Sequence, residues 1–343
     1  MIKKKRSSGK ISKKNFNGKS ASPNLVSYTK DLEDMRYEVS KIVVGQKNVV
    51  EGILRALLAN GHVLIEGVPG IAKTLLIRSI AESAGCKFSR IQFTVDLLPA
   101  DITGLTTYTP GKGFETIKGP VFANFIIADE INRAPPKTQS ALLEAMQERQ
   151  VTIGKETYKL DLPFFVMANN NPLESSGTYK LPEAQIDRFL FKLKMGYPEL
   201  EEEEQIMDKN ITVYKFEEYG LKKILSPEKI IRLQEVTKNV ESSPTIRSYI
   251  VRLVDATRHS KKYNLRLGKY IEYGGSPRAT IALEIAAKAD AILNGKSYIT
   301  PQNVKNVAHD VFRHRLILNY EGQAENIDPD KIIDEVLSKV MVP

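Results

Sequence analysis

The chain has 343 residues, 42% hydrophobic and 27% charged, which is typical of a globular protein with two domains. Its single cysteine, Cys86, excludes an internal disulfide and favours a reducing setting. No apolar run has the length of a membrane span, and the first residues lack the apolar stretch of a signal peptide. We therefore expect a cytoplasmic protein without a membrane span.

Residues 1–24 differ in composition from the rest of the chain. Eight Lys and Arg residues fall within the first nineteen positions with no acid among them, although the whole chain has a net charge of only +9. The segment is also rich in Ser, Asn and Gly, so it cannot bury a core. We predict a disordered basic tail, and a solvated tail is favoured over a tether to nucleic acid or anionic lipid.

Residues 25–198 alternate short apolar runs with segments of helical periodicity. In Ile42–Asn60 the apolar residues recur every three or four positions, as in an amphipathic helix. The five apolar runs, each bounded by turn-forming residues, are 62–65, 88–93, 125–128, 164–168 and 189–193. Strands that alternate with helices predict an α/β fold, with a parallel sheet covered on both faces.

Two stretches interrupt this alternation and are typical of β-hairpins. Leu105–Ile117 contains a turn at Pro110-Gly111-Lys112-Gly113, and Val151–Leu160 contains a turn near Gly154-Lys155. Both hairpins are expected as insertions into the α/β domain.

Beyond Pro198 the chain has only helical patterns. Three Ser-Pro or Thr-Pro pairs mark helix starts, because the hydroxyl caps the helix and proline fits its first turn. These pairs are Ser226-Pro227, Ser276-Pro277 and Thr300-Pro301. Residues 199–343 are therefore predicted to form an α-helical second domain.

A glycine-rich loop separates the first predicted strand from a helix. Its residues are Gly67, Val68, Pro69, Gly70, Ile71, Ala72, Lys73 and Thr74, and Leu75 continues into the helix. Backbone N–H groups at such a turn form a concave site for phosphate oxygens. Lys73 would add a positive charge for the β- and γ-phosphates of ATP, and Thr74 a hydroxyl for Mg²⁺. Because Ala72 replaces the usual glycine before the lysine, we predict a negative φ there.

Asp129 and Glu130 follow the apolar run 125–128 directly. The carboxyl end of a buried strand is where α/β sheets place their ligands. Asp129 is predicted to hold Mg²⁺ through its water shell, and Glu130 to orient and deprotonate the attacking water.

Three further residues are candidates for sensing the nucleotide. Asn171, after the run 164–168, can donate to the γ-phosphate and accept from the attacking water, with Asn169 and Asn170 as alternatives. Arg188 is predicted to be an arginine finger for the ATP of a neighbouring subunit, or else to form a surface salt bridge. Arg278 lies in the first turn of a helix, where a cation is unfavourable, which indicates a bound γ-phosphate or a nearby acid.

Together these motifs resemble those of the MoxR family of AAA+ ATPases. The resemblance extends from Val44 to Leu318 and does not include the basic tail. The stretches that carry it are 67–74, 90–94, 96–104, 129–134, 181–189 and 276–279. Val95 and the pair Asn169-Asn170 depart from the residues that the family usually has.

The resemblance implies an ATPase core, a helical lid, a hexameric ring, and two hairpins that face the pore or the client in related machines. It implies the roles given above for Lys73, Thr74, Asp129, Glu130, Asn171, Arg188 and Arg278, and places Val44, Gly45 and Gln46 beside the adenine. Family members are typically chaperone-like and often act with a partner that has a von Willebrand factor A domain. Some take part in cofactor or metal insertion into a client enzyme.

Three functions are compatible with these patterns, and a protein-remodelling ATPase is favoured. A nucleic-acid motor or transcription activator is the runner-up, but residues 25–343 are about neutral and contain no recognisable DNA-binding module. A nucleotide-gated scaffold that hydrolyses little is disfavoured, because it has no need of a water-activating acid such as Glu130.

Overall fold

The computed structural model describes residues 23–68, 70–111, 113–170, 178–209 and 215–343. Most of the expected basic tail, residues 1–22, lies outside this range, as do Pro69 and Asn171. The first helix, α1 (Pro23–Ser40), begins two residues before the expected end of the tail. No helix in the described part of the chain is long and apolar enough to cross a membrane.

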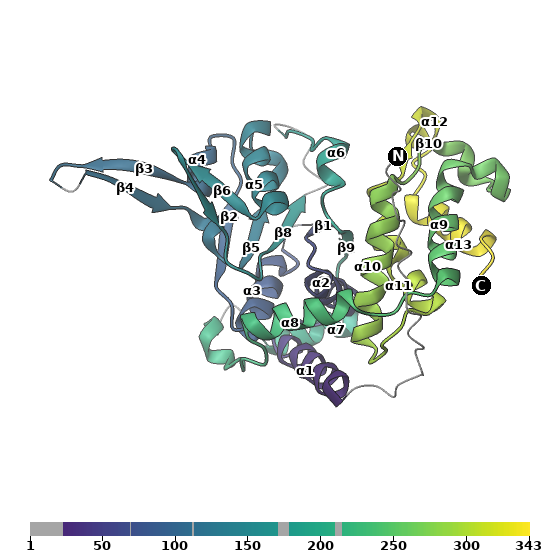
Figure 1. The fold of residues 1–343 in the computed structure, drawn as a ribbon, viewed down its shortest axis with the longest axis horizontal. Helices are drawn as coiled ribbons and strands as arrows, with labels where there is room; N and C mark the ends of the chain where they lie inside the picture. The colour runs from purple at the N-terminus through teal and green to yellow at the C-terminus, as the bar shows by residue number, and fades with distance from the viewer. Residues whose placement is uncertain (1–22, 69, 112, 171–177, 210–214) are drawn as a thin grey trace, which may run out of the picture.

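A five-stranded sheet forms the centre of the α/β part, as predicted (Figure 1). Its strands are β1 (Val63–Gly67), β2 (Phe88–Gln92), β5 (Phe125–Asp129), β8 (Phe165–Asn170) and β9 (Phe191–Met195). All neighbours pair in parallel in the order β2-β5-β8-β1-β9, so all carboxyl ends meet at one edge. After β1 the chain forms β2, β5 and β8 on one side of β1 and then β9 on its other side. The strand order therefore reverses at β1, and α/β proteins bind ligands at the carboxyl edge beside such a switch point.

Alternating side chains place the sheet between two hydrophobic clusters. Ile127 and Met167 point into one cluster, together with helices α1, α2 (Lys47–Leu58) and α3 (Lys73–Ser83). Ile126 and Val166 point into the other, against α4 (Pro99–Thr103) and α5 (Pro136–Glu148). Because successive residues of a strand face opposite sides, continuous apolar runs are what a sheet buried on both faces requires.

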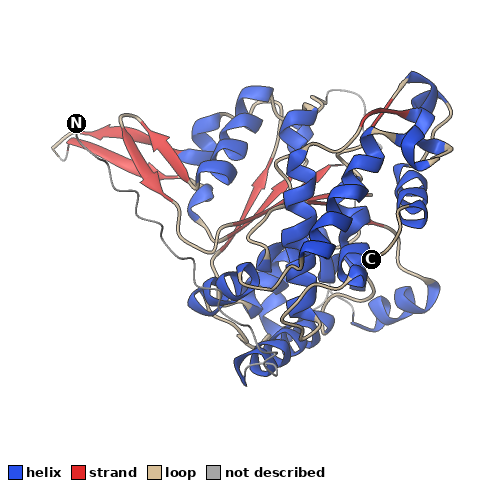
Figure 2. Cartoon of the chain, turned by 45° about the vertical axis from the view of Figure 1, so that its right-hand side comes forward, coloured by secondary structure: helices blue, strands red, loops and turns tan. Residues whose placement is uncertain are grey.

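Both predicted hairpins are confirmed. The first, β3 (Gly104–Thr109) with β4 (Gly113–Lys118), projects away from the helices, as Figure 2 shows in red. The second is β6 (Gln150–Ile153) with β7 (Glu156–Lys159). The projecting hairpin exposes four large apolar side chains, namely Leu105, Tyr108, Phe114 and Ile117.

The second part of the chain is mainly helical. Its helices are α7 (Leu200–Lys209), α8 (Pro227–Lys238), α9 (Pro244–Arg258), α10 (Pro277–Leu293), α11 (Pro301–Phe312), α12 (Tyr320–Ala324) and α13 (Pro329–Lys339). Ser226, Ser276 and Thr300 cap α8, α10 and α11 through their hydroxyl groups, as predicted. The prediction of helices alone was wrong, because β10 (Ile271–Tyr273) pairs with β11 (Ile317–Leu318). Strands this short leave no detectable alternation in the sequence.

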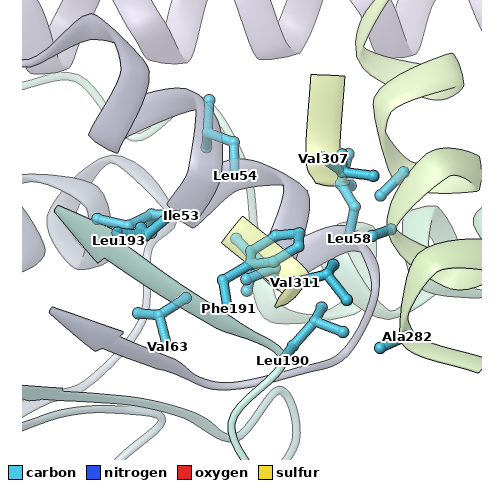
Figure 3. Packing of buried hydrophobic residues seen from close by; sticks show 14 of the residues in the cluster. Ile53, Leu54, Leu58, Val63, Leu190, Phe191, Leu193, Ala282, Val307 and Val311 are labelled. Atoms are coloured by element: carbon cyan, nitrogen blue, oxygen red, sulfur yellow. The ribbon is translucent and has the colours of Figure 1, made fainter. Parts of the chain in front are cut away.

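The helical part packs directly on the sheet at β9. Phe191 lies beside side chains of α2 and α11, including Val311, in a cluster that also contains Ala282 of α10 (Figure 3). Beside this apolar contact, Arg55 of α2 pairs with the fully buried Asp290 of α10 at 2.7 Å. One continuous core therefore joins the helical part to the α/β part.

Candidate active site

The glycine-rich loop runs from the end of β1 to the start of α3. Gly67 is required by its surroundings, because a Cβ there would lie 2.5 Å from the carbonyl oxygen of Met195. Gly70 has a φ of +84°, a conformation that favours glycine. Lys73 begins α3, is only 9% exposed and donates its ammonium group to the Gly67 carbonyl. The ammonium group is thereby held at the start of the loop, and Lys73 lines the pocket described below.

Ala72 does not have the predicted conformation. Its φ is +60° and its ψ +28°, in the left-handed region, so the prediction of a negative φ was wrong. The loop turns through this residue as it enters α3, and that turn explains why glycine is usual there. A Cβ in the left-handed region costs about 1–2 kcal/mol.

Asp129 and Glu130 lie at the carboxyl end of β5, where Asn169 of the neighbouring β8 contacts both. The side-chain oxygen of Asn169 accepts the backbone N–H of Glu130 at 2.7 Å, and its amide donates to an Asp129 carboxylate oxygen. Glu130 has a φ of +56°, which is strained for a residue with a side chain. Asn169, which is 3% exposed, therefore holds the backbone that aims Glu130.

Two residues of β2 complete this arrangement and were not proposed from the sequence. Arg90 donates to the second Asp129 oxygen at 2.6 Å and 3.0 Å, and Gln92 donates to Glu130 at 2.9 Å. Arg133 also pairs with Glu130, at 3.1 Å. The signal was present, because Arg90 and Gln92 are two apart on a strand and must face the same side.

These groups surround a pocket of about 560 Å³. It is lined by Gly70, Ala72, Lys73, Thr74, Leu75, Arg90, Gln92, Asp129, Glu130 and Asn169. Burial lowers the pKa of Lys73 from its usual value, and the charges of Asp129 and Glu130 oppose that shift. One ammonium group, one hydroxyl and two carboxylates around one pocket fit a triphosphate with a magnesium ion.

The other predicted contacts of the nucleotide are not in this lining. Asn171, the predicted γ-phosphate sensor, lies outside the described residues, as does Pro69. Val44, Gly45 and Gln46 precede α2, and the Gln46 amide donates to the Gly196 carbonyl just after β9, at 2.9 Å. That contact places the segment near the carboxyl edge of the sheet, beside the strand next to β1.

Arg188 and Arg278 lie together in a second pocket of about 390 Å³. Arg188 follows the short helix α6 (Glu183–Ile186) and donates to the Leu143 carbonyl at 3.2 Å. Arg278 lies 3.7 Å from the carboxylate of Asp187, so the nearby acid considered from the sequence is present. Arg315 lines the same pocket, and Asp187 is the only acid among its described lining residues. The two pockets share no described lining residue.

Comparison with known proteins identifies the families of both parts of the chain. Residues 62–191 match the ATPase family associated with various cellular activities (AAA), and residues 264–336 match the AAA lid domain. Chaperone MoxR1 of Mycobacterium tuberculosis is 47% identical over 315 residues, which span 91% of this chain and 82% of the relative. The uncharacterized protein YeaC of Bacillus subtilis is 44% identical over 306 residues, 89% and 92% of the two chains.

A solved structure also matches along almost its whole length. It is a Cytophaga hutchinsonii protein with an inferred ATPase assignment, 46% identical, with a TM-score of 0.86. The match spans 93% of this chain and 97% of that chain. With the phosphate loop, the paired acids and the helical lid in place, the chain belongs to the MoxR family of AAA+ ATPases.

Proposed function

We propose that the protein hydrolyses ATP to ADP and phosphate in a Mg²⁺-dependent reaction, as a ring of identical subunits, and couples the reaction to the remodelling of another protein. The observation that carries the proposal is that the acids and the two candidate arginines line different pockets. The acids and Lys73 lie in one pocket, and Arg188 and Arg278 lie in another. Because the two pockets share no described lining residue, we infer that an arginine acting on the triphosphate from the second pocket comes from a neighbouring subunit.

Within one subunit, each group of the first pocket has a separate task. Lys73 and the loop N–H groups bind the β- and γ-phosphates. Thr74 and Asp129 would hold Mg²⁺, which when bound neutralises charge on the phosphate oxygens. Glu130, aimed by Asn169, accepts the proton of the attacking water. Val44, Gly45 and Gln46 would lie by the adenine, and Asn171 would contact the γ-phosphate.

The neighbouring subunit supplies positive charge. Arg188 would stabilise the charge that develops as the γ-phosphoryl group leaves, an effect of about 10³–10⁵ in rate in other nucleotide hydrolases. Arg278, whose side chain is 58% exposed, would bind the same phosphate group. Every subunit then offers one face with a nucleotide pocket and another with arginines. Such a head-to-tail interface forms a ring when the rotation between neighbouring subunits closes, and we propose a closed ring of six subunits.

The projecting hairpin supports a role in protein remodelling. Leu105 and Ile117 are exposed on one face, and Tyr108 and Phe114 on the other, with ring centroids 5.3 Å apart. Exposed apolar clusters of this kind are typical of surfaces that contact other proteins. We propose that the remodelled protein is a client enzyme into which a cofactor or metal is inserted. We also propose that a partner with a von Willebrand factor A domain acts together with this protein. One relative is named as a chaperone.

The proposal is tested by measuring phosphate release from Mg·ATP by the purified protein. We expect turnover that stops when Mg²⁺ is chelated and that is lost in Lys73→Ala. Lys87→Ala serves as the matched control, because Lys87 is exposed and does not line the pocket. A purified protein with no affinity for Mg·ATP would rule the proposal out.

A further inference from the structure

The basic segment Arg313-His314-Arg315 follows α11 in the lid and joins it to the part of the chain that carries Arg188. The Arg313 guanidinium donates to the Lys192 carbonyl at 3.0 Å, and a His314 ring nitrogen lies 3.0 Å from the Phe189 carbonyl oxygen. Three consecutive side chains of the lid are therefore directed at residues 187–192.

Arg315 makes the most complete of these contacts. Its residue is 7% exposed, and every one of the five N–H groups of a guanidinium has an acceptor here. Its acceptors are the Asp187 carboxylate at 2.7 Å and the carbonyl groups of Asp187 at 3.2 Å, Phe189 at 2.8 Å, Leu190 at 3.1 Å and Val311 at 2.6 Å. Four of the five acceptors belong to residues 187–190, the turn on which Arg188 stands. A buried charge with so many partners fixes that turn in one geometry.

Asp187 extends the connection to Arg278. One carboxylate oxygen accepts from Arg315. The other lies 3.7 Å from Arg278 and 3.4 Å from the Ser276 hydroxyl that caps α10. The acid next to the proposed finger therefore contacts the first turn of α10, from which Arg278 extends.

We propose that Asp187 and Arg315 are positioning residues for ATP hydrolysis, which fix Arg188 to the lid so that Arg188 and Arg278 reach the neighbouring triphosphate as one rigid unit. The inference rests on the proposed role of Arg188 as an arginine finger. Neither positioning residue needs to touch the nucleotide. Their effect on the rate arises because a shift of about 1 Å in a catalytic group can cost about a hundredfold.

The test replaces the carboxylate with its isosteric amide, Asp187→Asn, in the full chain. We expect kcat to fall by about tenfold to a hundredfold, while the KM for ATP stays within about twofold, because the subunit's own pocket is intact. Asp330→Asn is the matched control. It removes an acid that pairs with Arg313 at 2.7 Å but does not contact residues 187–190. The control should keep the wild-type kcat.

Two additional measurements separate positioning from a general effect on the fold. In an Arg188→Ala background, Asp187→Asn should cause a smaller loss of kcat than it does in the wild type, because one of the two arginines that Asp187 positions is already absent. Rings mixed from Asp187→Asn and Glu130→Gln subunits should regain activity. At some junctions the intact Glu130 of an Asp187→Asn subunit meets the correctly held Arg188 of a Glu130→Gln subunit. Arg315→Lys, which keeps the charge but loses the planar fork, should behave in the same way.

The outcomes distinguish the two proposals. If Arg188→Ala regains activity with Glu130→Gln but Asp187→Asn does not, the positioning role is wrong and the finger role stands. If neither variant regains activity, the finger role fails, and the positioning role with it. A wild-type kcat in both Asp187→Asn and Arg315→Lys would also overturn the inference.

Discussion

The side chain of Asn169 accepts the backbone N–H of Glu130 at 2.7 Å, across two neighbouring strands of the sheet. The same side chain donates to Asp129, so a single amide fixes both acids of the pocket. Glu130 itself has a left-handed backbone conformation that the contact helps to maintain. The geometry of the proposed base therefore depends on a residue that is almost fully buried.

Asn169→Ala is expected to lower kcat by about tenfold to a hundredfold, because Glu130 loses the contact that holds its backbone. Affinity for ATP should change little, since Lys73 and the phosphate loop remain. Steady-state ATPase kinetics and binding of a fluorescent ATP analogue test the two expectations separately. Asn124→Ala provides a comparison, because Asn124 also joins two segments by side-chain bonds but lies outside the pocket. Equal losses of kcat in both variants would indicate a general effect on the sheet.

Glu130→Gln should bind Mg·ATP but hardly turn it over, because an amide cannot accept the proton of the attacking water. A loss of about 10²–10⁴ in kcat is typical of removing a general base. The bound triphosphate should also stabilise the ring, which size-exclusion chromatography with and without ATP can show. Full turnover in this variant would remove Glu130 from the mechanism. The same variant is suited to trapping client and partner proteins by co-purification.

Ala72→Gly should raise the free energy of unfolding by about 0.5–1 kcal/mol. Glycine removes the left-handed strain at a φ of +60°, and its greater freedom in the unfolded chain offsets part of the gain. Denaturant unfolding in the absence of nucleotide measures the difference. Ala84→Gly is the control with the opposite sign, because Ala84 has a φ of −84° and gains nothing from glycine. A destabilised Ala72→Gly would contradict the assigned backbone conformation.

Acid should destabilise the fold through His62. Its Nδ1 accepts the backbone N–H of Val166, its Nε2 lies 3.2 Å from the Met146 carbonyl, and burial lowers its pKa to about 4. The unfolded chain therefore binds a proton that the folded chain does not, between about pH 6.5 and pH 4. The stability that neutral His62 contributes is fully present above pH 6.5. As the pH falls to about 4, the free energy of unfolding decreases by about 3 kcal/mol.

Denaturant unfolding at pH 7.5 and pH 5 measures this loss, and a His62→Gln variant is the control. The variant should be less stable at pH 7.5 but lose less stability on acidification. His314, whose pKa burial also lowers, adds to the same trend and remains in both proteins. If His62→Gln loses as much free energy of unfolding between pH 7.5 and pH 5 as the wild type does, another group is responsible.

The sequence predicts the strands and motifs well, because each depends on local patterns. The apolar runs identified all five strands of the sheet, and the caps Ser226, Ser276 and Thr300 identified three helix starts. The short strand β10 was missed because three residues give no periodic signal. Ala72 was assigned the wrong backbone region because residue type alone does not determine the direction of a turn.

Contacts between distant segments could not be read from the sequence. Asn169 was an alternative to Asn171, and only the order of β5 and β8 in the sheet places it against both acids. Four of the five hydrogen bonds of Arg315 likewise depend on packing of the lid against residues 187–190, just before β9. Residue type limits what a side chain can bind, and the fold determines which partner lies within reach.

The most direct test of the account is the ATPase rate per subunit as a function of protein concentration, with oligomer size measured in parallel. Because Arg188 must come from a neighbour, the rate should rise in step with assembly and should be low in the monomer. In Arg188→Ala the rate should stay low even when assembly is complete. A rate that does not depend on concentration, in a protein shown to be monomeric, would contradict catalysis across a subunit interface.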